Sequence, residues 1–253
     1  MFLAVDAGNS NIVIGVFDEK SWIHQWRIET EHFLESTVFD KEIIAHLKGL
    51  EIDSAIVSSV VPAITKDLLI SIKNTVDIEP TVLRGSINTG IKLATDNREE
   101  VGTDIIANAV GAYNHFQESC IIVDFGTATT VMVVQKPGVL AGGAISAGLE
   151  TSIEALVGNA AQLSEFSIQV PPGAMANSTA EAMQSGLVLG HIAMVEGLVQ
   201  RMKKESGAQK VIATGGLSTL LAPYTEVFDE VDPMLTLNGL RIIEAKEKRQ
   251  KEE

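Results

Sequence analysis

Short apolar runs separated by polar turns fill the first half of the chain, and their lengths predict mostly strands. Three runs rich in β-branched and aromatic residues follow one another closely, at Leu3–Asp6, Asn11–Phe17 and Trp22–Glu29. Apolar residues at helical spacing then predict a helix at Ser36–Lys48. A buried strand is predicted at Ser54–Val60, and a helix that Pro62 introduces is predicted at Ala63–Thr75. The order is three strands, helix, strand, helix.

The second half repeats this order. Its predicted strands are Cys120–Asp124, Thr130–Gln135, Val139–Ile145 and Lys210–Thr214, and its predicted helices lie near Leu149–Val157, Thr179–Ser206 and Leu237–Lys248. Such a repeat predicts an α/β protein with a mixed sheet in each half. Because Val101–His115 is also predicted to be helical, we divide the chain into domains at residues 1–115 and 116–253 without a flexible linker.

Two similar loops stand at matching places in the two halves. Both have the pattern D-x-G-[NT]-x-[NT], as DAGNSN at Asp6–Asn11 and DFGTAT at Asp124–Thr129. Glycine permits a tight turn whose backbone N–H groups face an anion, while the leading Asp can hold a cation or water beside it. Ordinary hairpin turns use the same residue types. The matched pair favours two loops that bind one polyphosphate.

Composition narrows the range of partners. The chain has 253 residues, of which 45% are hydrophobic and 21% charged, and a formal charge of −14. These values are typical of a globular protein, but the negative charge argues against nucleic acid or an anionic membrane as the main partner. We expect a phosphate site to use backbone donors, helix ends and a metal ion rather than a lysine-rich surface.

Several features are typical of a cytoplasmic protein. The single cysteine, Cys120, lies in an apolar run and cannot form an internal disulfide, which fits a reducing compartment. The first residues reach a charge at Asp6 without a basic segment, so no signal peptide is expected. No apolar run approaches the roughly 18 residues that a membrane span needs.

The duplicated unit with its two D-x-G loops resembles the acetate and sugar kinase, Hsc70 and actin superfamily. Within that superfamily, the chain is similar to the type III pantothenate kinases. The segments that carry this resemblance are DAGNSN at Asp6–Asn11, VGTD at Val101–Asp104, DFGTATT at Asp124–Thr130, GGAISAGL at Gly142–Leu149 and the glycine turn ATGG at Ala213–Gly216. Their order and spacing together are specific, and the resemblance extends from residue 1 to about residue 240.

The resemblance implies a fold and an activity. The fold would be duplicated ribonuclease-H-like (actin-like ATPase) domains with mixed sheets and an interdomain ATP cleft. The activity would be ATP-dependent phosphorylation of pantothenate to 4′-phosphopantothenate, the first step of coenzyme A biosynthesis. Also implied are a homodimer with the acceptor site near its interface, and Mg²⁺ and a monovalent cation, K⁺ or NH₄⁺, as cofactors.

The ATP side of the implied site comes from the two loops. Asp6 would orient Mg²⁺ through its water shell, and Asp124 would bind the monovalent cation. Without the resemblance, the sequence does not distinguish K⁺ from Mg²⁺ at Asp124. The residues implied to contact ATP are Asp6, Ala7, Gly8, Asn9, Ser10, Asn11, Ile12, Val13, Gly126 and Thr127.

Asp104 is the implied catalytic base. It would accept the proton of the primary hydroxyl of pantothenate as that oxygen attacks the γ-phosphorus. Because an apolar helical run follows Asp104, a structural role as helix N-cap is the alternative. The residues implied to contact the acceptor are Thr95, Gly102, Thr103, Asp104, Ile105 and Thr179.

Thr179 lies in a segment that also has a purely structural prediction. Ser178-Thr179-Ala180-Glu181 has the capping-box pattern, with Ser178 as the N-cap of a helix. A capped helix start can also bind a carboxylate or phosphate, so the two roles are compatible.

Three departures from the family pattern fall on the acceptor side. The family pattern G-x-D-R ends here in Ile105, so an aliphatic residue replaces a cationic contact. Thr95 stands where relatives usually have tyrosine, and a frequent Asp-Asn-Pro turn ends in Arg98. Arg98 is a candidate to supply the missing cation, although Glu99 and Glu100 offer it partners in a solvated loop.

Two other functions stay open. The first keeps the fold and the ATP site but takes another small hydroxylated acid as acceptor. The second is a regulatory or accessory protein without turnover, as some relatives are known to be. The joint presence of Asp6, Asp104, Asp124 and Thr127 argues against the second, because a non-catalytic binder needs no base.

Overall fold

The structure is a computed structural model that describes residues 1–34, 45–159 and 167–252. The chain divides into two compact units. The first comprises Met1–Ile91, Thr95–Gly111 and Leu235–Glu253, and the second comprises Lys92–Ala94 and Ala112–Met234. By its contacts, the C-terminal helix therefore belongs to the first unit. The division into domains at residues 1–115 and 116–253 stays a prediction.

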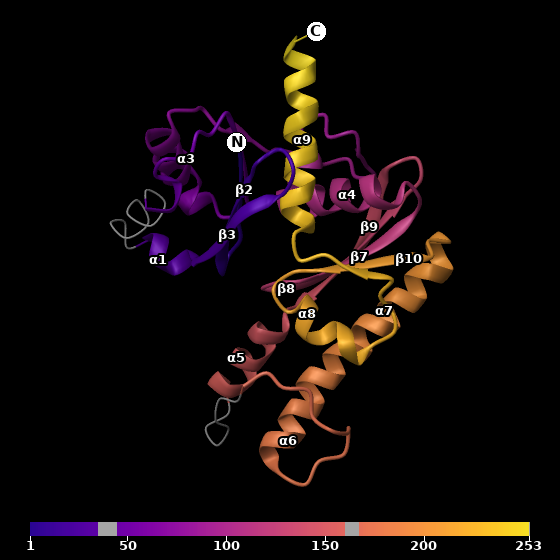
Figure 1. The fold of residues 1–253 in the computed structure, drawn as a ribbon. Helices are drawn as coiled ribbons and strands as arrows, with labels where there is room; N and C mark the ends of the chain where they lie inside the picture. The colour runs from indigo at the N-terminus through magenta and orange to yellow at the C-terminus, as the bar shows by residue number, and fades with distance from the viewer. Residues whose placement is uncertain (35–44, 160–166, 253) are drawn as a thin grey trace. The chain divides into compact units, whose positions relative to one another are not determined.

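The first unit is built on a five-stranded sheet with the order β3-β2-β1-β4-β5. Two of its strands, β2 and β3, are labelled in Figure 1. β1 pairs antiparallel with β2 and parallel with β4, so the sheet is mixed. The strands are β1 (Phe2–Ala7), β2 (Asn11–Phe17), β3 (Trp22–Glu29), β4 (Ser54–Ser59) and β5 (Thr81–Val82), and the short helix α1 (Thr30–Leu34) follows β3. Most of the predicted helix Ser36–Lys48 lies outside the described residues.

Alternating apolar residues on β1 and β2 form a core with α3 (Pro62–Val76). Leu3 and Val5 of β1 are fully buried, and Leu68 of α3 is fully buried as well. Pro62 lies at the start of the helix, where a backbone N–H would have no hydrogen-bond partner within the helix, so its missing N–H costs nothing. This core fixes β1, and with it the position of Asp6 near the end of the strand.

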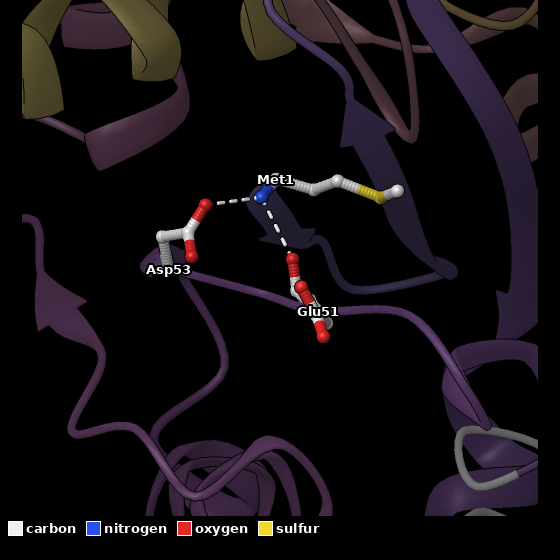
Figure 2. A network of polar contacts seen from close by, with 3 residues as sticks. All are labelled: Met1, Glu51 and Asp53. Atoms are coloured by element: carbon white, nitrogen blue, oxygen red, sulfur yellow. Dashed lines mark hydrogen bonds and ion pairs between the residues drawn. The ribbon is translucent and has the colours of Figure 1, made fainter.

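Figure 2 shows the polar contacts that hold the start of β1. The Met1 ammonium donates hydrogen bonds to the Glu51 carbonyl oxygen, at 2.7 Å, and to the Asp53 carboxylate. The hydrogen bond from the ammonium is the main reason why the pKa of the Asp53 carboxyl is lowered. Because the Asp53 side chain is 76% exposed, this ion pair contributes little to stability.

The second unit is built on a six-stranded sheet with the order β11-β10-β7-β8-β9-β6. β7 pairs antiparallel with β8 and parallel with β10. The short strand β6 pairs parallel with β9 and forms the edge of the sheet, an addition that the sequence did not predict. The strands are β6 (Lys92–Leu93), β7 (Cys120–Phe125), β8 (Ala128–Gln135), β9 (Val139–Ala147), β10 (Lys210–Thr214) and β11 (Glu230–Val231).

Each strand of the first sheet has a counterpart in the second sheet, which contains β6 in addition, and this confirms the predicted repeat. In both, the central strand lies between an antiparallel hairpin partner and a parallel strand that comes later in the chain. Asp6 lies opposite Ser58 of the parallel strand β4. Asp124 lies opposite Thr214 of the parallel strand β10. The leading carboxylate of each D-x-G loop therefore has a hydroxyl residue at the same register position.

The long predicted helix over Thr179–Ser206 is confirmed, with a wider turn inside it. The helical run consists of α6 (Thr179–Gln184), a π-helical segment η2 (Ser185–Leu189) and α7 (Gly190–Ser206). Ser178 caps its start, accepting a hydrogen bond from the Glu181 N–H at 3.3 Å. The other helical segments of this unit are α5 (Leu149–Asn159), α8 (Ser218–Leu221) and η3 (Ala222–Tyr224).

The same helical run is the one segment, within the described residues, with the length and composition of a membrane span. Its most apolar window has a mean hydropathy of 1.3, although the sequence contains no uninterrupted apolar run of that length. A core helix of a soluble protein passes the same test. Ile192, Val195 and Val199 of α7 belong to the core of the second unit, and 33% of the most apolar window is buried.

α4 (Thr103–Phe116) and α9 (Leu235–Glu252) approach each other closely through small residues (Figure 1). A Cβ atom placed on Gly239 of α9 would overlap with the backbone of Ala107 in α4. Beside this contact, the Thr236 hydroxyl donates to Asn108 Oδ1 at 2.7 Å. α9 also packs against β1 and β4. It therefore holds the N-terminal part of α4 within the first unit.

We predict that Gly239→Ala destabilises the protein by about 1–3 kcal/mol, because the added methyl group overpacks the contact with Ala107. Gly197→Ala is the matched control, since Gly197 lies in α7 with no atom within 4 Å of an added Cβ. That change should leave stability unchanged or raise it by up to about 1 kcal/mol. Urea unfolding measures both. Equal free energies of unfolding for the two variants would contradict the close contact.

Candidate active site

The first hairpin, which joins β1 to β2, is held by its own backbone and by Thr30. The Gly8 N–H donates to the Asn11 carbonyl oxygen at 2.9 Å. The buried Thr30 donates its N–H to the Ser10 carbonyl oxygen at 2.9 Å and its hydroxyl to the Gly8 carbonyl oxygen at 2.8 Å. The Gly8 N–H, expected to face an anion, is thus used inside the turn. The exposed residues Asn9 and Ser10 present the polar surface of the hairpin.

The side chains of this hairpin's predicted ATP residues point in different directions. Ala7 and Ile12 are fully buried, so their side chains belong to the core and only their backbone is available to a ligand. Gly8, Asn11 and Val13 are half-buried. The polar and backbone groups of the turn, rather than its apolar side chains, are what a phosphate could contact.

Asp6 is linked by hydrogen bonds to the start of α4. The Ser58 hydroxyl donates to Asp6 Oδ1 at 2.7 Å. The same Ser58 oxygen lies 2.9 Å from Thr103 Oγ1. Thr103 is the first residue of α4, and Asp104 is the second. The fold therefore brings the predicted Mg²⁺ residue Asp6 close to the segment that carries the predicted base.

Asp104 lies in the first turn of α4, within the helix rather than before it. Its Oδ1 accepts a hydrogen bond from the Ile105 N–H at 2.8 Å. Burial raises the pKa of the Asp104 carboxyl above its usual range, and the backbone hydrogen bond from Ile105 only partly offsets this effect. A raised pKa makes the carboxylate a stronger base, which suits proton abstraction near neutral pH. The hydrogen bond that it accepts from the Ile105 N–H, in the first turn of the helix, also gives Asp104 part of the structural role of a helix N-cap.

Gly102 makes room for that carboxylate. A Cβ atom at Gly102 would overlap with Asp104 Oδ1. The Gly102 carbonyl oxygen accepts the N–H of Ile106 at 3.1 Å, which starts the helix. The glycine of the VGTD segment is thus required by the position of the Asp104 side chain.

The second hairpin, which joins β7 to β8, is supported by the start of α5. The Gly126 N–H donates to the Ala128 carbonyl oxygen at 3.2 Å, a bond that resembles the one across the first hairpin. The Thr127 carbonyl oxygen accepts the Gly148 N–H and the Thr151 hydroxyl, both at 2.9 Å. A Cβ atom at Gly148 would overlap with the hairpin backbone, so Gly148 permits this support. Gly126 and Thr127 themselves are exposed.

The predicted cation residue, Asp124, lies beside the glycine turn after β10. A Cβ atom at Gly215 would overlap with Asp124 Oδ1 and would lie 2.6 Å from the Phe125 nitrogen. Gly215 has a φ of +90°, which favours glycine. Next to it, Thr214 Oγ1 is buried and has no hydrogen-bond partner among the described residues. The glycine turn at Ala213–Gly216 therefore contacts the second D-x-G loop directly.

A buried histidine supports the second hairpin from the helical run. His191 Nε2 lies 2.9 Å from the hydroxyl oxygen of Thr129, and both residues are buried. The His191 ring also lies 6.1 Å from the Phe125 ring. Removal from water lowers the pKa of His191, so the imidazole is neutral near pH 7. His191 follows the π-helical segment η2, and such segments are frequent at functional sites.

The residues predicted on the acceptor side are distributed over both units. Thr95 and Arg98 are exposed, and Arg98 begins the short helical turn η1 (Arg98–Glu100). No ion pair joins Arg98 to Glu99 or Glu100 within the described residues. Ile105 is half-buried at the start of α4. Thr179, in the second unit, is the exposed first residue of α6.

Sequence reasoning missed three residues that support the site, namely Thr30, Ser58 and His191. Ser58 and Thr30 are hydroxyl residues inside or beside strands, where the sequence pattern shows only the alternation of buried positions. His191 lies in a long helical run, and its contact with the second hairpin depends on the fold. No cluster of three or more metal-binding side chains occurs among residues 1–34, 45–159 and 167–252.

Comparison with solved structures supports the fold. A structure described as a Baf family transcriptional activator from Campylobacter jejuni matches with a TM-score of 0.65 and 20% identity, covering 98% of this chain and 99% of that one. MreB5 of Spiroplasma citri bound to ADP matches with a TM-score of 0.56 and 9% identity, covering 99% and 98%. At these identities the likeness concerns the fold alone. The chain has the actin-like fold that sugar kinases share.

Comparison of sequences identifies the family. The family model of the type III pantothenate kinases matches residues 2–201. The type III pantothenate kinase of Geobacter sp. strain M21 is 41% identical over 256 residues, covering 98% of this chain and all of that protein. Further relatives of the same name are 39–43% identical over at least 96% of this chain. The chain belongs to the type III pantothenate kinase family.

We predict a pH dependence of stability that comes from His191. Its folded-state pKa is lowered, whereas the unfolded chain takes up the proton near pH 6.5. The neutral imidazole therefore contributes stability that is complete above about pH 6.5 and is lost as pH falls toward the folded pKa. His191→Gln keeps a polar group near Thr129 but does not titrate, so its melting temperature should fall less between pH 7 and pH 5.5.

His32→Gln is the control, since the His32 side chain is 57% exposed. Its melting temperature should follow the wild-type pH profile. If His191→Gln also followed the wild-type profile, the neutral buried imidazole would not be a source of acid sensitivity.

Proposed function

We propose that the protein transfers the γ-phosphoryl group of ATP to pantothenate, giving ADP and 4′-phosphopantothenate for coenzyme A biosynthesis. The observation that carries this proposal is the family relationship, at about 40% identity over nearly the whole chain. The structure supports a kinase function through Asp104. This residue lies at the start of α4, and the pKa of its carboxyl is raised.

Each hairpin is proposed to contact ATP. In the first, the exposed groups of Asn9 and Ser10, with the backbone of the flanking residues, would bind phosphate oxygens. In the second, Gly126 and Thr127 are exposed at the turn. The full set proposed to bind ATP is Asp6, Ala7, Gly8, Asn9, Ser10, Asn11, Ile12, Val13, Gly126 and Thr127. Since the chain carries a charge of −14, donors held in turns suit this task better than a basic surface would.

Two carboxylates are proposed as cation residues, Asp6 for Mg²⁺ through water and Asp124 for K⁺ or NH₄⁺. Both are half-buried at strand ends beside the hairpins. Carboxylate oxygens suit these hard cations, and Mg²⁺ is often held by one or two carboxylates together with substrate phosphates. When bound, Mg²⁺ neutralises charge that develops on the phosphate oxygens.

Asp104 is proposed to act as general base. Its carboxylate accepts the proton of the primary hydroxyl of pantothenate while the hydroxyl oxygen forms a bond to the γ-phosphorus. The bond from that phosphorus to the β,γ-bridging oxygen breaks, and ADP leaves with the bonding pair. Gly102, Thr103 and Ile105 around this carboxylate, together with Thr95 and Thr179, are proposed to contact the acceptor.

A second candidate acceptor is another small hydroxylated acid. The observation that favours it is the absence of the cationic family residue at Ile105, together with Thr95 in place of tyrosine. Arg98 offers a cation on the same segment, and its guanidinium is exposed. We propose that Arg98 compensates for Ile105 in binding an anionic acceptor, since a charge-assisted hydrogen bond is stronger than a neutral one.

The cellular setting is proposed from the same relationship. We propose a cytoplasmic homodimer whose partners are ATP and pantothenate rather than nucleic acid or a membrane. The acidic charge supports the exclusion of polyanions. An accessory role without turnover is disfavoured because the Asp104 carboxylate is held at the start of α4 by the Ile105 N–H and has a raised pKa, which a non-catalytic binder does not need.

The test of the function is ATP consumption with pantothenate and with a panel of other hydroxylated acids. Asp104→Asn should lower turnover by about 10²–10⁴-fold, the usual cost of losing a general base. Asn can keep the hydrogen bond from the Ile105 N–H, so ATP affinity and the melting temperature should stay near the wild-type values. Turnover close to that of the wild type in Asp104→Asn would reject the base. Consumption only with another acceptor would reject pantothenate.

The two cation roles predict different responses in two variants. Asp6→Asn should raise the Mg²⁺ concentration needed for half-maximal activity, whereas Asp124→Asn should reduce activation by K⁺ or NH₄⁺. Titration of each cation against initial rate measures both effects. Identical changes in the two variants would mean that the carboxylates do not have separate roles.

A further inference from the structure

Ser58 is the residue through which two parts of the first unit meet. It lies at the end of β4 with 0% of its surface exposed. Its hydroxyl oxygen lies 2.7 Å from Asp6 Oδ1 in β1 and 2.9 Å from Thr103 Oγ1 in α4. The parallel register of β1 and β4 places Ser58 opposite Asp6. A buried hydroxyl thus joins a strand to the helix that carries Asp104.

The chemistry of the three groups fixes the direction of these hydrogen bonds. An ionised carboxylate only accepts, so the single hydroxyl hydrogen of Ser58 is donated to Asp6. Ser58 then has only lone pairs left for Thr103. The hydroxyl of Thr103 is therefore the donor in the second bond. The result is a chain of two hydrogen bonds, in which Thr103 donates to Ser58 and Ser58 donates to Asp6.

We propose that Ser58 is a positioning residue that holds the Asp6 carboxylate and the start of α4 in one fixed relation. This inference rests on the proposed function, in which Asp6 serves Mg²⁺·ATP and Asp104 is the base. Asp104 follows Thr103 directly, so a displacement of Thr103 moves the base as well. Ser58 touches neither substrate in this account, and it acts through Asp6 and Thr103.

The second half of the chain provides an internal comparison. There Thr214 occupies the register position beside Asp124 that Ser58 occupies beside Asp6. The Thr214 hydroxyl has no hydrogen-bond partner among the described residues. The equivalent register alone therefore does not produce a hydroxyl chain. The hydrogen-bond chain through Ser58 occurs in the first half, where it reaches Thr103, directly before the proposed base Asp104.

The experiment uses Ser58→Ala, Thr103→Val and the double variant, with Thr103→Ser as the conservative change. Ser54→Ala is the matched control, because Ser54 is also a buried serine of β4 and lies four residues away at the other end of the strand. Three quantities are measured for each protein. They are the melting temperature without ligands, the affinity for ATP as a function of Mg²⁺ by calorimetry, and kcat at saturating substrates.

Ser58→Ala should weaken Mg²⁺-dependent ATP binding and lower kcat, each by about tenfold or more, as expected for loss of a buried hydrogen bond to a charged group. Thr103→Val leaves Ser58 able to donate to Asp6, so kcat should fall while ATP affinity changes less than about threefold. In the Ser58→Ala background, Thr103→Val should have no further effect on kcat. Thr103→Ser keeps the hydroxyl, so it should lower kcat less than Thr103→Val does.

Several results would overturn the inference. They are wild-type ATP affinity in Ser58→Ala, additive losses of kcat in the double variant, or equal losses of ATP affinity in Ser54→Ala and Ser58→Ala. If Ser58→Ala does not fold, the contrast between Thr103→Val and Thr103→Ser in kcat decides. A wild type that fails to phosphorylate pantothenate would reject the proposed function, and the calorimetric comparison would still test the role of Ser58.

Discussion

The parallel pairing of each central strand with a strand from later in the chain sets the geometry of the candidate site. This pairing places Asp6 beside Ser58 and Asp124 beside Thr214. Each carboxylate stands at the end of a strand that is buried by apolar neighbours, so its backbone cannot move without disturbing a core. Within the first unit, the first hairpin and the start of α4 are placed relative to the end of β1. Within the second unit, the second hairpin and the glycine turn at Gly215 are placed relative to the end of β7.

The chemistry follows from how polar groups are held at these strand ends. The turns use their own backbone hydrogen bonds for shape, and Thr30, Gly148 and Thr151 fix them from neighbouring segments. Partial burial then gives Asp104 the raised pKa that suits a base. The proposed polyphosphate site is compatible with an acidic protein, because preorganised donors and cations act locally whatever the net charge.

The sequence predicted most of the fold because apolar periodicity determines it. β2, β3 and β10 begin and end at the predicted residues, since a change from apolar to turn residues marks both ends of each strand. The short strands β5, β6 and β11 were missed because two residues carry no periodicity. The D-x-G pattern located both hairpins. It could not reveal the roles of Ser58 and His191, which depend on contacts 52 and 62 residues away in the chain.

The central claim is that both hairpins bind ATP. Amide hydrogen exchange tests this claim most directly. Exchange is compared with and without Mg²⁺ and a non-hydrolysable ATP analogue at saturating concentration. The account predicts slower exchange in peptides that cover Ala7–Asn11 and in peptides that cover Phe125–Thr129, with no change around Gly49, which lies outside both hairpins. Protection of only one hairpin, or of neither, while calorimetry shows the analogue bound would contradict the account.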